Sequence, residues 1–153
     1  KLTLEYATAF EKELKKAGVK KIFMTRTKDT SLSMPERIRM LRDTAPDLLI
    51  SIHFNSSSVH TVKGTSTFYR HIGFRPLTQT ILKRMMELGL AEFGNVGSFN
   101  FALSGPTDYP NCLVEVAFLS NRSDEKFILS KKSPANVAKK IRHGIQDWLQ
   151  EAR

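Results

Sequence analysis

Hydrophobic side chains recur at helical spacing in several stretches of the chain. Near its start, apolar residues three and four apart predict a helix over residues 4–17, and Gly18 is a typical residue to end it. A second helix is predicted over residues 33–44, because Ser33 and Glu36 have the spacing of a capping box. Two longer amphipathic helices are predicted over residues 76–93 and from Ser133 onward.

Four shorter stretches, rich in apolar and β-branched residues, are predicted to be strands. They cover residues 19–25, 47–53, 64–69 and 112–118. Helices that alternate with such strands favour an α/β fold with a largely parallel, twisted sheet and helices on both faces. The sequence shows no internal repeat and no sign of a second domain, so we expect a single domain over residues 1–153.

Composition and charge narrow the classes of partner. The formal net charge of +9 is high for 153 residues and favours an anionic partner, such as a nucleic acid, an anionic lipid or an acidic cell-envelope polymer. The alternative is a merely solubilising surface. The single cysteine, Cys112, excludes an internal disulfide and a cysteine-based metal cluster. No apolar run approaches the roughly 20 residues of a membrane span, and no signal peptide is visible, so the abrupt helical start suggests a fragment or a processed product.

Two predicted strands carry an ionisable side chain among apolar neighbours. His53 follows the run 48–52 at the point where the chain becomes polar, and Glu115 lies between Val114 and Val116. A carboxylate in a buried strand is unfavourable unless it is paired, protonated or bound to a metal. A neutral imidazole is a common zinc ligand, and a nearby glutamate can activate a zinc-bound water. The alternatives are a structural histidine, and a Glu115 that faces water at a sheet edge or forms a buried ion pair.

Three sequence segments carry a more specific signal. SIHFN at residues 51–55, GTSTFY at 64–69 and PNCLVEVAFLSN at 110–121 follow one another along the chain. Together they resemble the zinc-dependent N-acetylmuramoyl-L-alanine amidases of bacterial cell walls (the amidase type 3 family). In that family an S-I-H-x-N segment supplies a zinc-binding histidine, matched here by His53. A segment of the form L-V-E-x-x-F-[LI]-S-N supplies the catalytic glutamate, matched by Glu115.

The resemblance spans nearly the whole chain and implies a peptidoglycan hydrolase of the bacterial cell envelope, periplasmic or secreted. The cofactor it implies is zinc. The bond it implies joins the lactyl group of N-acetylmuramic acid to L-alanine of the stem peptide. Glu115 would take a proton from the attacking water and pass it to the departing amine. The excess of lysine and arginine suits an anionic wall.

The chain departs from the family pattern in two places. The family begins with a strand that ends in a His-Gly-Gly segment, whose histidine is a zinc ligand, and a glutamate ligand follows. Neither has a counterpart here, so the resemblance implies an N-terminally incomplete catalytic domain in which His53 is the one retained metal ligand. We therefore expect weak or absent zinc in this chain by itself. Before the last strand, where the family often has an arginine, this chain has Ala102-Leu103-Ser104.

Two other classes of function stay open at this point. A noncatalytic peptidoglycan-binding or regulatory domain with the same fold would not need the missing ligands. A basic nucleic-acid-binding α/β domain is less compatible with the sequence, because the lysines are scattered and no aromatic ladder interleaves them, so we expect no nucleic-acid partner. The sequence leaves the oligomeric state open. If the amidase interpretation is correct, His53 and Glu115 lie on neighbouring or near-neighbouring strands and face one common cleft.

Overall fold

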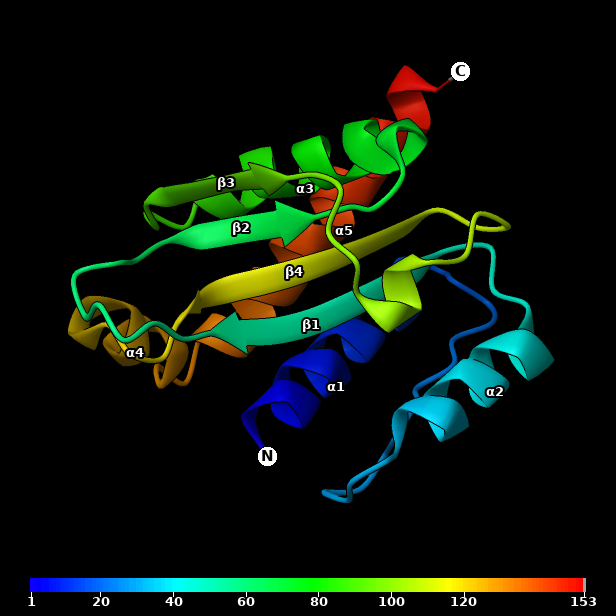
Figure 1. The fold of residues 1–153 in the computed structure, drawn as a ribbon, viewed down its shortest axis with the longest axis horizontal. Helices are drawn as coiled ribbons and strands as arrows, with labels where there is room; N and C mark the ends of the chain where they lie inside the picture. The colour runs from blue at the N-terminus through cyan, green and yellow to red at the C-terminus, as the bar shows by residue number, and fades with distance from the viewer. Residues whose placement is uncertain (153) are drawn as a thin grey trace.

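The computed structural model describes residues 1–152, in which helices and strands alternate (Figure 1). In chain order the elements are α1 (Leu2–Lys16), α2 (Met34–Thr44), β1 (Leu49–Asn55), β2 (Thr65–Phe68), the 3-10 turn η1 (Ile72–Phe74), α3 (Arg75–Met86), β3 (Glu92–Val96), the 3-10 turn η2 (Ala102–Ser104), β4 (Asn111–Phe118), α4 (Arg122–Ile128) and α5 (Ser133–Glu151). Within the described residues, no helix has the length and apolar character needed to span a membrane.

The four strands form one sheet in the order β1-β4-β2-β3. β1 pairs with β4, and β2 pairs with β3, in the parallel sense, whereas β2 runs antiparallel to β4 at the centre of the sheet. Two of the three pairings are therefore parallel. This arrangement confirms the predicted α/β fold with a largely parallel sheet, whereas the described helices that pack on the sheet lie mainly on one of its faces.

The two faces of the sheet have different coverings. Helices α1, α3 and α5 lie together behind the sheet in Figure 1, and they pack on the face that bears Ile52, Val114 and Val116, which we call the helical face. The other face bears His53 and Glu115, and we call it the open face. In Figure 1 the chain between β3 and β4, including η2, crosses in front of this face, while α2 lies beyond the edge strand β1.

The main hydrophobic core lies between the helical face and its three helices. Val114 and Val116 of β4, Ile81 of α3 and Ile141 of α5 are fully buried there. α3 and α5 approach closely because residue 144 is a glycine. A Cβ atom built at Gly144 would lie 2.5 Å from the Ile81 Cα. The core thus holds β4, the strand that carries Glu115, in a fixed position.

Tyr6 links α1 to the C-terminal part of the fold. Its hydroxyl donates a 2.8 Å hydrogen bond to the carbonyl oxygen of Ile128, and the Ser133 Oγ lies at the same distance, 2.8 Å. The ring packs edge-on against Phe54 of β1, with 4.8 Å between the ring centroids. Burial raises the pKa of Tyr6 to about 12 and outweighs the opposing effect of the Ser133 hydrogen bond. One side chain therefore joins α1, β1 and the start of α5.

The prediction of a strand over residues 19–25 is wrong, because the structure has no strand there. A strand needs a neighbour to receive its backbone hydrogen bonds, and this segment pairs with none of the described strands. It is held instead beside the start of α1, where Arg26 donates a 2.8 Å hydrogen bond to the Thr3 hydroxyl. The apolar side chain of Phe23 stays 63% exposed, so it does not mark a buried strand as the sequence pattern indicated.

The prediction of one helix over residues 76–93 is wrong at its C-terminal end. α3 ends at Met86, and Gly89 adopts a left-handed backbone with φ +78° that turns the chain out of the helix. The strand β3 then begins at Glu92. The predictions for α1, α2 and α5 are confirmed, including the capping box of α2, in which Ser33 and Glu36 exchange two hydrogen bonds. The short helix α4 was not predicted.

Candidate active site

The two candidate residues lie side by side in the sheet. His53 of β1 and Glu115 of β4 are direct partners in the parallel pairing of the two strands. Adjacent strands are about 4.8 Å apart, and partners in register project to the same face. Ile52 and Val114, one position earlier, point to the helical face, which leaves His53 and Glu115 on the open face. The predicted placement on neighbouring strands and one face is confirmed, and the common cleft stays a prediction.

Glu115 lies in an environment that favours its protonated form. The side chain is half-buried, and its Oε2 atom is buried with no hydrogen-bond partner among residues 1–152. Burial without a compensating partner raises the pKa of Glu115 to about 7. A carboxyl group with a pKa near neutrality can both accept and donate a proton under ordinary conditions, as general acid–base chemistry requires. The alternative of a buried ion pair is not supported, because no cation among residues 1–152 pairs with Glu115.

His53 has an environment that favours the neutral imidazole. Its side chain reaches solvent, but partial burial lowers its pKa, and the positive charge of Arg37 lowers it further. The Arg37 guanidinium is held by hydrogen bonds to the Leu32 carbonyl oxygen (3.3 Å) and the Thr25 hydroxyl (3.4 Å). The His53 Nε2 atom lies 3.2 Å from the Ser51 hydroxyl, two residues earlier on the same face. A neutral, accessible imidazole is the form that binds metals.

A third strand brings a residue to the site that the sequence did not indicate. Ser66 of β2 is the antiparallel partner of Glu115, on the side away from His53. Its side chain is fully buried, and its Oγ atom has no hydrogen-bond partner in the described chain. Two unpaired oxygens, from Ser66 and Glu115, thus occupy neighbouring positions. Side chains of a strand alternate between the two faces of a sheet, so the sequence could place Ser66 on the face opposite to Thr65 and Thr67. Only the pairing of β2 with β4 shows that Ser66 lies next to Glu115.

The loops that follow β1 and β4 are tied together beside these residues. The Ser57 N–H donates to the Ser120 hydroxyl at 2.9 Å, and the Asn121 amide donates to the His60 carbonyl oxygen at 2.8 Å. The His60 Nδ1 lies 2.9 Å from the Ser120 carbonyl oxygen. His60 therefore fixes the loop after β1. Ser120 and Asn121, the end of the glutamate-bearing segment, thus join the loops after β1 and β4.

A buried carboxylate fixes the beginning of β2 and the end of β4. Asp124 of α4 is 4% exposed, and one of its oxygens accepts hydrogen bonds from the Gly64 N–H (2.7 Å) and the Phe118 N–H (3.0 Å). Asn121 caps the same helix by accepting hydrogen bonds from two backbone N–H groups. The short helix α4 thus anchors β4, the strand that carries Glu115, and its neighbour β2.

The described residues do not by themselves provide a complete zinc site. Across residues 1–152, no three histidine, cysteine, aspartate or glutamate side chains come together in a way that could hold a metal. His53 offers one imidazole, and protein zinc sites use three or four ligands. His53 therefore suits a single position in a metal site.

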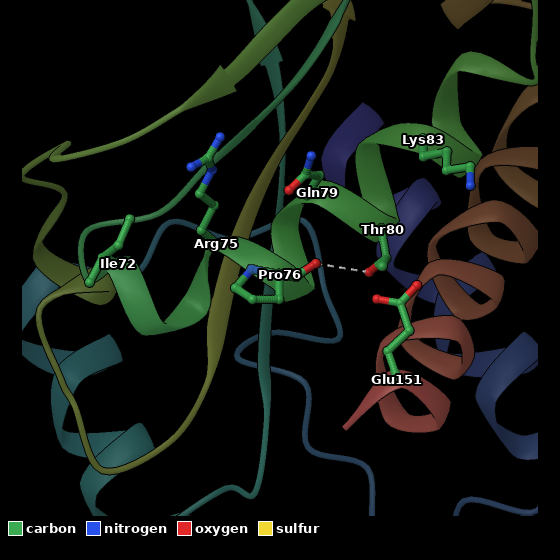
Figure 2. Close-up of a pocket in the computed structure, with 7 residues that line it drawn as sticks. All are labelled: Ile72, Arg75, Pro76, Gln79, Thr80, Lys83 and Glu151. Atoms are coloured by element: carbon green, nitrogen blue, oxygen red, sulfur yellow. Dashed lines mark hydrogen bonds between the residues drawn. The ribbon is translucent and has the colours of Figure 1, made fainter. Parts of the chain in front are cut away.

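A hollow elsewhere on the surface has no relation to this site. Neither His53 nor Glu115 borders it. Within it the Thr80 hydroxyl donates a 3.2 Å hydrogen bond to the Pro76 carbonyl oxygen, which is a bond internal to the helix. Figure 2 shows the residues that line it, from η1, α3 and the end of α5: Ile72, Arg75, Pro76, Gln79, Thr80, Lys83 and Glu151.

Solved structures share this fold closely. The catalytic domain of CwlV, an N-acetylmuramoyl-L-alanine amidase from Bacillus (Paenibacillus) polymyxa var. colistinus, superposes with a TM-score of 0.89 at 28% identity. The match covers 97% of this chain and 83% of that one. An N-acetylmuramoyl-L-alanine amidase from Clostridium difficile 630 superposes with a TM-score of 0.90 at 27% identity, over 99% of this chain and 84% of that one.

Sequence comparison gives the same class of protein. The family described as N-acetylmuramoyl-L-alanine amidase matches residues 1–147, and the chain therefore belongs to that family. The probable cell wall amidase LytH of Staphylococcus aureus is 29% identical over 126 residues, which are 82% of this chain and 41% of that protein. The chain thus spans about two fifths of the length of the curated relatives it matches. The resemblance inferred from the sequence segments is confirmed, whereas the roles of His53 and Glu115 stay predictions.

Proposed function

We propose that this domain hydrolyses peptidoglycan at the amide bond between N-acetylmuramic acid and the L-alanine of the stem peptide. The observation that carries the proposal is the pairing of His53 with Glu115 on the open face, where Glu115 has a pKa of about 7. Membership of the amidase family and the likeness to catalytic domains of amidases support it. Peptidoglycan, an anionic polymer, also suits the net charge of +9.

Glu115 acts as the general base and then as the general acid in this proposal. Its carboxylate removes a proton from a water molecule while the water oxygen forms a bond to the lactyl carbonyl carbon. The protonated Glu115 then donates that proton to the nitrogen of L-alanine, and the carbon–nitrogen bond breaks. The products are a free lactyl carboxyl group and a peptide with a free amino terminus. A positioned acid–base group of this kind accelerates a reaction by about 10²- to 10⁴-fold.

His53 is proposed as a zinc ligand in the active enzyme. Zinc, when bound, would polarise the scissile carbonyl and so favour attack by water. Arg37 and partial burial keep the His53 imidazole neutral, which is the state in which it binds a metal. Further ligand positions would have to be filled from outside the described residues, since these bring no second and third donor to His53.

The proposed place of action is the bacterial cell envelope, either periplasmic or secreted, where the substrate is. The second candidate function is noncatalytic binding of peptidoglycan or regulation of another hydrolase. The incomplete donor set around His53 favours it, since binding needs no metal.

Purified peptidoglycan distinguishes the two functions. The full-length protein is incubated with it in zinc-supplemented buffer and, in parallel, with a chelator, and the soluble products are analysed by mass spectrometry. Amidase activity releases peptides that begin with L-alanine, creates no new reducing sugar ends and stops in chelator. Sedimentation of the protein with peptidoglycan in both buffers, without peptide release, would support the binding function and reject the hydrolase.

A further inference from the structure

A cluster of three phenylalanine rings lies on the open face beside Glu115. Phe99 and Phe101, from the chain between β3 and β4, stack with 4.9 Å between centroids and an interplanar angle of 24°. Both rings meet Phe68 of β2 edge-on, at 5.0 Å and 5.8 Å. We call these three residues the aromatic platform. None of them was singled out from the sequence.

The register of the sheet places the platform close to the candidate catalytic group. Phe68 pairs with Leu113, and Ser66 pairs with Glu115, so Phe68 and Glu115 lie on the same face, two residues apart along the sheet. Two residues of a strand span about 7 Å. The platform is therefore continuous with the open face around Glu115 and extends toward η2, the 3-10 turn that crosses in front of the sheet in Figure 1.

The platform has a buried base and an accessible top. Phe68 is only 5% exposed, whereas Phe99 is 43% exposed. Phe99 stays in place because its N–H donates a 3.4 Å hydrogen bond to the Tyr69 carbonyl oxygen. Ser98, just before it, adopts a left-handed backbone with φ +58°, a conformation uncommon for serine. The chain is thus turned sharply to present this ring at the surface.

Polar groups on both sides of the exposed ring define the kind of ligand it suits. Ser98 and Asn100 flank Phe99, and both are exposed with donor and acceptor groups. A purely apolar partner would leave these groups unpaired on binding, at a free-energy cost. A pyranose ring offers C–H groups on one face for the negative π surface and hydroxyl groups at its rim for hydrogen bonds.

We propose that the aromatic platform binds a sugar ring of the glycan strand through Phe99, and so positions the neighbouring lactyl amide over Glu115. This inference rests on the proposed amidase function for its orientation, but the sugar site itself can be measured without hydrolysis. Phe99 acts as a specificity-determining residue, because it contacts the glycan rather than the atoms that react.

The test compares four proteins: wild type, Phe99→Ala, Phe99→Tyr and Phe93→Ala. Phe93 is the matched control, because it is 46% exposed and packs on one aromatic neighbour, Phe118, but lies on the edge strand β3. Binding of N-acetylglucosamine tetrasaccharide and of an isolated stem peptide is measured by NMR titration. We expect Phe99→Ala to weaken binding of the tetrasaccharide about tenfold, with near-normal binding in Phe99→Tyr and Phe93→Ala and no change for the peptide.

Hydrolysis of peptidoglycan supplies an independent measurement. Phe99→Ala should lower kcat/KM for peptidoglycan about tenfold, because the lost sugar contact both binds the substrate and orients its amide. Unchanged tetrasaccharide binding in a folded Phe99→Ala protein would reject the platform while leaving the amidase proposal intact. Loss of peptide binding instead of sugar binding would also reject it. Sugar binding that depends on Phe99 in a protein without hydrolytic activity would retain the platform and reject the amidase.

Discussion

The helical face and the open face of the sheet differ in how many of their buried polar side-chain atoms lack a hydrogen bond. On the helical face the Thr67 hydroxyl donates a 3.0 Å hydrogen bond to the Thr78 carbonyl oxygen of α3. On the open face, the Oε2 of Glu115, the Oγ of Ser66 and the Oδ1 of Asn111 are buried without a partner. Among residues 1–152, the remaining buried side-chain atom without a partner is the Nδ2 of Asn95, which lies on the helical face as the partner of Thr67. The Oδ1 of the same amide accepts hydrogen bonds from Thr67 and Thr78.

Within the single strand β4, some residues therefore contribute to stability and another to the proposed chemistry. Residues of β4 alternate between the two faces, so that Val114 and Val116 pack against helices while Glu115 between them points to the open face. Unpaired buried oxygens destabilise a fold and persist where they serve a function. The helical face therefore supplies the free energy that holds Glu115 in an unfavourable environment. Substitutions on the two faces should have opposite consequences.

The largest expected effect is on turnover, in the variant Glu115→Gln. The substitution preserves shape but removes the proton acceptor, so hydrolysis of peptidoglycan should fall about 10²-fold or more. The free energy of unfolding at pH 8 should not fall, because no buried partner of the carboxylate is left unpaired. Release of L-alanine-terminated peptides and denaturant unfolding measure the two effects. Near-normal turnover with a large loss of stability would assign Glu115 a structural role instead of the catalytic one.

Glu115 also makes the free energy of unfolding depend on pH. Burial raises the pKa of Glu115 from 4.5 to about 7 in the folded state, so the folded protein binds a proton more tightly than the unfolded chain. The resulting stabilisation is complete below about 4.5 and is lost as the pH rises through about 7.

The contribution of Glu115 is isolated by subtracting the variant Glu115→Gln from the wild type. Several surface carboxylates, such as Asp147 beside Arg84, have lowered pKa values and give the opposite slope in both proteins. We expect the wild type, relative to the variant, to lose free energy of unfolding between pH 4.5 and 7. Parallel stability curves for the two proteins across this range would show that Glu115 titrates normally.

The close contact between α3 and α5 gives the largest expected effect on stability. Gly144→Ala would place a Cβ atom 2.5 Å from the Ile81 Cα, so the two helices must separate. We expect a loss of about 1–3 kcal/mol in the free energy of unfolding, although alanine is the better helix former. Gly73→Ala is the matched control, because a Cβ there meets no atom within 4 Å. Turnover per folded molecule should be unchanged, and equal stability of the two variants would contradict the packing argument.

The sequence predicts the helical face better than the open face, for a physical reason. Residues of the helices on the helical face follow a local rule, the amphipathic spacing seen in α1 and α5. The failures arise where a long-range contact or a backbone turn decides the outcome. Residues 19–25 have strand-like composition but find no neighbour, and Gly89 turns the chain out of α3 within a pattern that still looks helical.

The candidate site was predictable only in part. The short segments around His53 and Glu115 resemble a known family, which drew attention to both residues. The register that makes them direct partners, and that adds Ser66 on the other side of Glu115, depends on pairings between distant segments. The stacking of Phe99 on Phe101 and Phe68 joins residues of a strand and a later loop, and no local pattern marks it.

The smallest expected effect concerns one hydrogen bond on the helical side. Tyr6→Phe removes the hydroxyl that bonds to the Ile128 carbonyl oxygen and contacts Ser133, and it keeps the ring packed against Phe54. We expect the free energy of unfolding to fall by about 1 kcal/mol, since the buried partners lose one neutral hydrogen bond. The control is Tyr109→Phe, because the Tyr109 ring is also largely buried. Within residues 1–152 its hydroxyl makes no hydrogen bond, so removing it should change stability less.

A double-mutant cycle with Ser133→Ala assigns the energy of the Tyr6 contact. If the two hydroxyls interact, the double variant Tyr6→Phe/Ser133→Ala should lose less stability than the sum of the two single variants. Peptidoglycan turnover per folded molecule should stay at the wild-type level in all of them, because Tyr6 lies behind the sheet from Glu115. A fall in turnover without a fall in stability would mean that the two faces are coupled, and that the helical side also tunes the chemistry on the open face.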